Sequence, residues 1–164
     1  MAKLILVCGP VGVGKTTYAI SLCEEIGGVR FSIDPWMQTL YAKDMTSLDF
    51  KWMMERVNRC YEQIWETANQ ILLLDGVVVL DLGFSSSDQR HYFYDKAKEI
   101  NVNAELHYLK APREIRKARV EKRNLEKDLS VYSFEVTDQM FNFMEPRFEV
   151  PDTEELQNGC SIDL

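Results

Sequence analysis

The chain has 164 residues, of which 46% are hydrophobic and 27% are charged, and it carries a net charge of −7. These values are ordinary for one globular domain. They do not fit a membrane protein, because no run approaches the ~20 apolar residues that a span needs. The four cysteines are scattered and no secretory signal pattern is present, so we expect reduced thiols and a cytoplasmic protein.

The charge is unevenly distributed along the chain. Residues 110–127 contain eight lysines or arginines and three glutamates, so this segment is basic within an otherwise acidic protein. A long nucleic-acid footprint requires many cationic contacts with phosphates, which the acidic remainder does not provide. We therefore expect one basic segment facing one polyphosphate, a small-molecule substrate, and neither nucleic acid nor membrane as a partner.

The first part of the chain predicts a phosphate-binding loop. An apolar strand over residues 3–8 leads into a glycine-rich turn, and a run with helical spacing follows. The turn has the pattern Gly, four free positions, then Gly-Lys-Thr, whose backbone N–H groups cradle phosphates at a helix N-terminus. Lys15 would reach the β- and γ-phosphates, and the Thr16 hydroxyl would ligate Mg²⁺. The expected binding residues are Gly9, Pro10, Val11, Gly12, Val13, Gly14, Lys15, Thr16 and Thr17.

A second short strand is predicted over residues 30–33, followed directly by Asp34 and Pro35. Asp at an N-cap and Pro at the first helical position are typical of a helix start, so Asp34 can be a cap of a helix that reaches about residue 42. Its position after a strand also points it at the ligand-binding edge of a sheet. A carboxylate there could accept the proton of an attacking hydroxyl, and both interpretations stay open.

The middle of the chain alternates between helices and strands. Helical spacing continues over residues 48–73, and residues 46–49 at its start resemble a capping box. A buried strand is predicted to follow over residues 77–82. Asp81 lies near the end of that strand, as expected for an acid that helps to hold Mg²⁺. It could equally be a solvated carboxylate or a cap for the serine-rich turn that follows. Further elements are a helix over 87–100, which contains the candidate phosphate or substrate contact Arg90, and a strand over 103–109.

The basic segment forms a predicted helix from Pro112 to about residue 127. Arg116, Arg119 and Arg123 are spaced to share one face, which suits phosphate oxygens. The alternative is a solvated helix whose arginines pair with its own glutamates. A loop over 129–136, a short helix over 137–144 and an edge strand over 159–164 complete the chain.

This alternation predicts an α/β fold with a mainly parallel sheet. Because ligands bind at the carboxyl ends of parallel strands, the loop, Asp34 and Asp81 should meet at one edge. We expect a single domain over residues 1–164.

Four motifs in this order resemble a known family: the loop, the Ser-Ile-Asp of residues 32–34, the Val-Leu-Asp of 79–81, and the arginine segment 116–124. The chain is similar to small P-loop kinases that are often labelled AAA-type ATP-binding proteins. This group is related to polynucleotide kinase, chloramphenicol phosphotransferase and zeta-toxin-like kinases. The resemblance implies a three-layer P-loop NTPase fold of the kinase type, with a five-stranded sheet, a central loop strand and a helical lid over about 113–136.

The resemblance also implies roles for individual residues. Asp34 would be the base for the acceptor hydroxyl, Lys15, Arg119 and Arg123 would contact ATP, and residues 148–152 would lie near the adenine. Two positions depart from the relatives. Met37 replaces an arginine of the polynucleotide kinases, and the Asp-Leu-Gly-Phe of residues 81–84 replaces a more polar motif.

Together these patterns predict an ATP- and Mg²⁺-dependent phosphotransferase that acts on a hydroxyl of a small molecule. The expected metal ligands are Thr16 and Asp81, and the expected catalytic residues are Lys15, Asp34, Arg116, Arg119 and Arg123. Two alternatives stay open, namely an NTP hydrolase or nucleotide-gated switch without an acceptor, and a kinase that processes nucleic-acid ends.

Overall fold

The apolar runs of the sequence form one five-stranded sheet in a computed structural model, which describes residues 1–44, 49–128 and 135–164. Its order is β2-β3-β1-β4-β5, and every pairing is parallel, so the predicted fold class and the central position of the loop strand are confirmed. The strands are β1 (Lys3–Cys8), β2 (Val29–Ser32), β3 (Val77–Asp81), β4 (Asn103–Lys110) and β5 (Gly159–Asp163).

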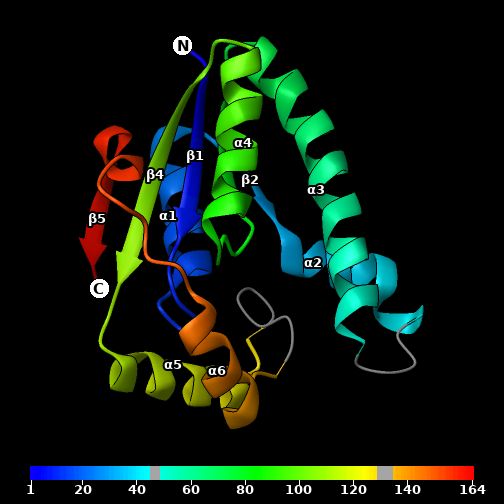
Figure 1. The fold of residues 1–164 in the computed structure, drawn as a ribbon, viewed down its shortest axis with the longest axis vertical. Helices are drawn as coiled ribbons and strands as arrows, with labels where there is room; N and C mark the ends of the chain where they lie inside the picture. The colour runs from blue at the N-terminus through cyan, green and yellow to red at the C-terminus, as the bar shows by residue number, and fades with distance from the viewer. Residues whose placement is uncertain (45–48, 129–134) are drawn as a thin grey trace.

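Helices cover both faces of this sheet, and two more lie at the carboxyl ends of the strands (Figure 1). The helices are α1 (Lys15–Ile26), α2 (Ile33–Tyr41), α3 (Phe50–Leu73), α4 (Ser87–Glu99), α5 (Arg113–Glu126) and α6 (Asp138–Met144). Short 3-10 turns occupy Ala42–Asp44, Glu145–Arg147 and Glu155–Asn158. Within the described ranges, no helix combines the length and hydropathy that a membrane crossing requires.

The central strand shows why its sequence is almost wholly apolar. Leu4, Leu6 and Cys8 pack into the larger core with residues of α3 and α4, whereas Ile5 and Val7 pack into a second core with residues of α1. Successive side chains of a strand point to opposite faces, so a strand covered on both faces must be apolar at every position. This continuous burial fixes β1 in the middle layer, and the loop at its carboxyl end is fixed with it.

The start of α2 differs from the prediction. The helix begins at Ile33 with Ser32 at the N-cap, so Asp34 is the second helical residue rather than the cap, and Pro35 is the third. Proline is tolerated there because the N–H groups of the first turn have no partner within the helix. The prediction that Asp34 caps this helix is therefore wrong, and its carboxylate is available for another purpose.

Other helix starts follow their local sequence. The Asp49 carboxylate caps α3 and accepts hydrogen bonds from the Lys51 and Trp52 backbone N–H groups at 2.9 and 3.2 Å. Thr46, the other end of the predicted capping box, lies outside the described residues, as do residues 129–134 of the predicted loop.

A buried ion pair holds the segment of residues 145–155, which leads from α6 toward β5, against α4. Arg90 of α4 is fully buried and donates to the two carboxylate oxygens of Glu155 at 2.6 and 2.9 Å. Its guanidinium also donates to the backbone carbonyls of Glu149, at 3.0 Å, and Phe84, at 3.3 Å. Arg90 is thus engaged inside the protein, and its predicted contact with a substrate or phosphate is wrong.

We expect Arg90→Met to lower the free energy of unfolding by about 3–5 kcal/mol, because it leaves the Glu155 carboxylate buried without its partner. Urea unfolding followed by circular dichroism measures the change. Lys96→Met is the matched control, because Lys96 pairs with the exposed Glu99 at 3.4 Å, and it should cost less than about 1 kcal/mol. Equal losses of unfolding free energy in the two variants would show that the buried ion pair stabilises the fold no more than the exposed pair does.

Candidate functional site

The turn between β1 and α1 has the backbone conformation that a phosphate-binding loop requires. Gly9, Gly12 and Gly14 all have positive φ angles, of 154°, 78° and 104°. A Cβ on Gly12 would lie 2.5 Å from the Arg116 carbonyl oxygen, so this position has no room for a side chain. Gly14 is the N-cap of α1 and offers no side-chain cap. The first N–H groups of the helix therefore remain available for an anion.

Lys15 folds back over this loop. Its ammonium group donates hydrogen bonds to the carbonyl oxygens of Gly9, at 2.8 Å, and Pro10, at 3.2 Å. Burial lowers the pKa of Lys15, and the negative charges of Asp81 and Asp34 partly oppose this effect. The amine is held at the centre of the loop, between the loop carbonyls and two carboxylates.

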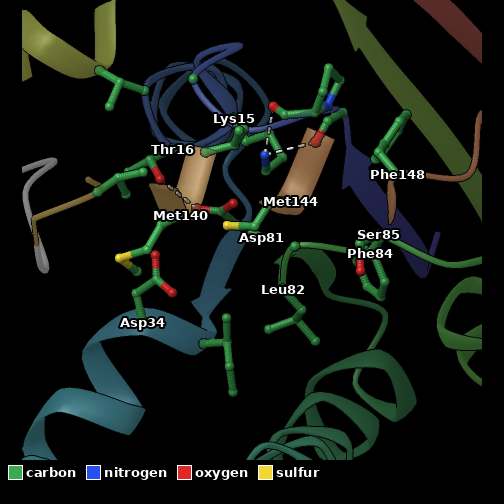
Figure 2. Close-up of a pocket in the computed structure, with 18 of the residues that line it drawn as sticks. Lys15, Thr16, Asp34, Asp81, Leu82, Phe84, Ser85, Met140, Met144 and Phe148 are labelled. Carbon is green, nitrogen blue, oxygen red and sulfur yellow. Dashed lines mark hydrogen bonds between the residues drawn. The ribbon is translucent and has the colours of Figure 1, made fainter. Parts of the chain in front are cut away.

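Three parts of the chain meet at the carboxylate of Asp81. The Thr16 hydroxyl donates to its Oδ2 atom at 3.1 Å, as Figure 2 shows. The Arg30 guanidinium donates to the same oxygen at 2.9 and 3.3 Å. The predicted neighbours Thr16 and Asp81 are thus brought together, although 65 residues separate them in the chain.

Sequence reasoning missed the role of Arg30 at this site. One signal was present, because Arg30 is a charged residue inside the short apolar strand that precedes Asp34. In the sheet, β2 pairs with β3, and Ser32 lies opposite Asp81. A basic residue two positions before Ser32 can therefore reach the acid at the end of the neighbouring strand.

Asp34 lies on the opposite side of the same space, where its side chain points toward the cavity (Figure 2). Burial raises the pKa of Asp34, and the charge of Asp81 raises it further, while Lys15, Arg123 and Arg30 act in the other direction. Among the described residues, no group donates a hydrogen bond to this carboxylate. Its role as a base stays a prediction.

The three arginines of α5 lie in different surroundings. Arg116 is buried, and its guanidinium donates to the carbonyl oxygens of Val11 and Ala111, each at 3.0 Å, and to both carboxylate oxygens of Glu145. Hydrogen bonding to Arg116 lowers the pKa of Glu145. Arg116 is therefore placed to hold the loop, and it pairs with Glu145 rather than with a glutamate of its own helix.

Arg119 and Arg123 are better placed for a ligand. Arg119 donates to the Val13 carbonyl oxygen at 3.1 Å, and both arginines line the cavity above the loop. Phe148 also lines this cavity and stacks on Tyr108 with ring centroids 5.9 Å apart. Its predicted place near an adenine stays a prediction.

These residues surround one cavity of about 1030 Å³. The glycine loop, Asp81, α5 and α6 line it, as do α2, the first turns of α3 and the residues after β3. A space of this size lies at the upper end of those that hold small ligands. The predicted meeting of the loop, Asp34 and Asp81 at one sheet edge is what the structure shows.

The pKa of Asp34 leads to a prediction about stability. Because the folded-state pKa lies above that of the unfolded chain, the folded protein binds more protons between the two values. The free energy of unfolding therefore falls as the pH rises through this window, and it stays lower above it. Asparagine cannot ionise, so Asp34→Asn should raise the free energy of unfolding at pH 7 to 8, and the gain should shrink as the pH falls toward 4.

Urea unfolding at several pH values tests this expectation. Asp95→Asn is the control, because Asp95 is exposed on α4 and does not line the cavity. A loss of stability in Asp34→Asn at neutral pH would contradict the raised pKa.

The geometry described above can be compared with known proteins. The fold matches Kti12 of Chaetomium thermophilum in complex with ADP-AlF3, with a TM-score of 0.72 and 18% identity, covering 98% of this chain and 88% of that one. It also matches a gluconokinase from Sinorhizobium meliloti 1021 (TM-score 0.61, 15% identity, 99% and 82% covered).

A third match is a sugar kinase from Janibacter sp. HTCC2649 (TM-score 0.61, 16% identity, 99% and 86% covered). At these identities the likeness shows the fold alone. A search of curated protein sequences finds no significant match. The family model AAA_33, described as an AAA domain, matches residues 4–151. This match extends over most of the sequence, and the chain therefore belongs to the AAA_33 family, in agreement with the resemblance of its motifs.

Proposed function

We propose that the protein is an ATP- and Mg²⁺-dependent phosphotransferase that moves the γ-phosphate of ATP to a hydroxyl of a small molecule in the cytoplasm. The observation that carries this proposal is the placement of Asp34. Its carboxylate lines the same cavity as the Lys15 loop and the Thr16–Asp81 pair, yet it does not cap its helix and accepts no hydrogen bond from a described residue. A carboxylate in this position can accept the proton of an attacking acceptor hydroxyl.

The loop side of the cavity suits the triphosphate. The N–H groups of the loop and of the first turn of α1 would bind the β- and γ-phosphates, and the Lys15 ammonium would exchange its loop carbonyls for phosphate oxygens. Arg119 and Arg123 line the same side and would stabilise the charge on the transferring group. Arg116 supports this arrangement by holding the Val11 carbonyl.

Thr16 and Asp81 fit a magnesium ion. They offer a hydroxyl and a carboxylate oxygen 3.1 Å apart, and both are hard ligands of the kind that Mg²⁺ takes. Among the described residues there is no group of three or more potential metal ligands. Mg²⁺ fits such a sparse site because it keeps waters and takes phosphate oxygens as further ligands. When bound, Mg²⁺ neutralises charge on the phosphate oxygens. Arg30 orients Asp81 from the other side.

Asp34 completes the proposed reaction. The acceptor hydroxyl oxygen attacks the γ-phosphorus while its proton passes to the Asp34 carboxylate, and the bond from the γ-phosphorus to the bridging oxygen breaks to release ADP. Burial and the Asp81 charge raise the pKa of Asp34, which makes it a stronger base than an ordinary aspartate.

The first test is transfer of label from γ-³²P-ATP to a panel of hydroxyl compounds. We expect Asp34→Asn to reduce transfer by about 10²-fold or more, because the proton acceptor is lost, while the affinity for ATP changes little. Lys15→Ala should instead lose affinity for ATP, measured by isothermal titration calorimetry. Asp95→Asn makes the same chemical change outside the cavity, and its label transfer and ATP affinity should equal those of the wild-type protein.

The rival functions give different results in this experiment. Phosphate release at the wild-type rate from Asp34→Asn, with no compound labelled by either protein, would support a hydrolase or a nucleotide-gated switch. Labelled oligonucleotides with steep salt dependence would support a kinase for nucleic-acid ends.

The second test concerns the metal. We expect Mg²⁺ to strengthen binding of a fluorescent ADP analogue to the wild-type protein by about tenfold or more, and to have little effect on Asp81→Asn, which lacks the charged ligand. In EDTA the two proteins should bind the analogue with similar affinity. Equal strengthening by Mg²⁺ in both would show that Asp81 does not hold the metal.

A further inference from the structure

The cavity has two halves of different chemistry. We call the part away from the glycine loop the acceptor half. It is formed by α2, the first turns of α3, the residues after β3, and α6 with the turn that follows it, and it contains Asp34. Most other side chains that line it are apolar. Those with exposed or half-buried side chains include Phe50, Met53, Met54, Met140, Phe143 and Met144.

Several of these side chains are exposed although they are large and apolar. Phe50 is 64% exposed, Phe143 is 52% exposed and Met144 is 41% exposed. They come from α3 and α6, yet they line one cavity. Apolar surface gathered in a concave site marks a place where a ligand or partner removes it from water. Methionine suits such a site because its flexible thioether adapts to different shapes.

The hydroxyl-binding position lies among these apolar side chains. Figure 2 shows Met140 and Met144 of α6 projecting into the space that Asp34 also faces. A hydroxyl that reaches the Asp34 carboxylate would therefore bring the rest of its molecule against methionine side chains.

Polar side chains of the acceptor half are largely occupied. Gln89 Oε1 accepts from the Ser85 hydroxyl and from the Ser86 backbone N–H, both at 3.2 Å, as part of the capping of α4. Asp49 is occupied by the cap of α3. A sugar needs many convergent donors and acceptors, because each buried hydroxyl without a partner costs free energy. With Gln139 of α6 as the one further amide among the described lining residues, this half offers fewer polar groups than a sugar needs.

Charge distinguishes the two halves further. The loop and α5 side contributes Lys15, Arg119, Lys122 and Arg123 together with Glu126 and Asp128, whereas none of the described cavity residues from α2, α3 and the turn after β3 is a lysine or arginine. Those elements contribute the carboxylates of Asp34 and Asp49 instead. An anionic acceptor would meet these carboxylates, and like charges repel.

Arg147, on the turn after α6, is a cation within this half of the cavity. Its guanidinium stands 3.5 Å from the centre of the Phe143 ring and donates to the Phe143 carbonyl oxygen. It is therefore already engaged with α6, and its long stem adds to the apolar wall.

From this chemistry we infer that the acceptor is a hydrophobic alcohol that carries no anionic group. It would place its hydroxyl at Asp34 and its aromatic or branched aliphatic body against the methionine and phenylalanine side chains of the acceptor half. This inference rests on the proposed phosphotransferase function. It separates the chain from kinases of sugar acids, sugar phosphates and polynucleotides by the chemistry of its own cavity.

A matched pair of compounds tests the inference. Methyl 4-(hydroxymethyl)benzoate is neutral, and 4-(hydroxymethyl)benzoate is the same alcohol with an anionic group. We expect the wild-type protein, saturated with a non-hydrolysable ATP analogue and Mg²⁺, to bind the ester at least about tenfold more tightly than the acid in equilibrium dialysis. With γ-³²P-ATP the ester should also be labelled faster than the acid, gluconate, ribose 5-phosphate or a 5′-hydroxyl oligonucleotide.

Variants link this preference to the acceptor half. Met140→Lys places a cation next to Asp34 and should reverse or abolish the preference for the ester. Met53→Lys is a second variant on the opposite wall, in case the first does not fold. Leu125→Lys is the matched control, because Leu125 is an exposed apolar residue of α5 that does not line the cavity. This variant should prefer the ester to the same degree as the wild-type protein.

The outcomes separate the inference from the function on which it rests. Tighter binding or faster labelling of gluconate, ribose 5-phosphate or the acid overturns the inference and leaves the kinase proposal intact. Failure to bind the ester at millimolar concentration overturns it as well. Phosphate release that survives Asp34→Asn, with no compound labelled, overturns the kinase proposal itself.

Discussion

The site depends on the buried charge of Asp81. Its Oδ2 atom accepts from Thr16 of α1 and from Arg30 of β2, so one oxygen connects the end of β3 to a neighbouring strand and to the first turn of α1. The same charge raises the pKa of Asp34 and opposes the lowering of the Lys15 pKa. A single carboxylate thus positions Thr16 and Arg30 and shifts the pKa values of Asp34 and Lys15.

The glycine loop is held from outside as well as by its own backbone. Arg116 and Arg119 of α5 donate to the carbonyls of Val11 and Val13, so the helix that supplies cations to the cavity also fixes the loop. On the other side, Arg90 fastens the segment after α6 to α4 through Glu155. Of these arginines, Arg116 and Arg90 order the surroundings of the cavity without lining it.

Local patterns and strand order were enough to predict the sheet, the loop and the meeting of Asp34 with Asp81. Glycine-flanked apolar runs become buried strands, and the carboxyl ends of parallel strands share one edge. The partners of Arg30 and Arg90, 51 and 65 residues away, could not be predicted, because no motif links them as the loop and the strand-end acid link Thr16 and Asp81. Such pairs depend on how side chains pack in three dimensions. The start of α2 was misplaced by two residues, because a proline near a helix start fits several positions of the first turn.

The guanidinium of Arg116 serves two backbone carbonyls and a carboxylate at once, from a buried position. Lysine, with one compact ammonium at the end of its stem, cannot reach such a spread of acceptors. A lysine at this position would therefore leave some of these acceptors without a donor, although Arg116 does not line the cavity. The shape of the glycine loop thus depends on a side chain that lies outside the cavity.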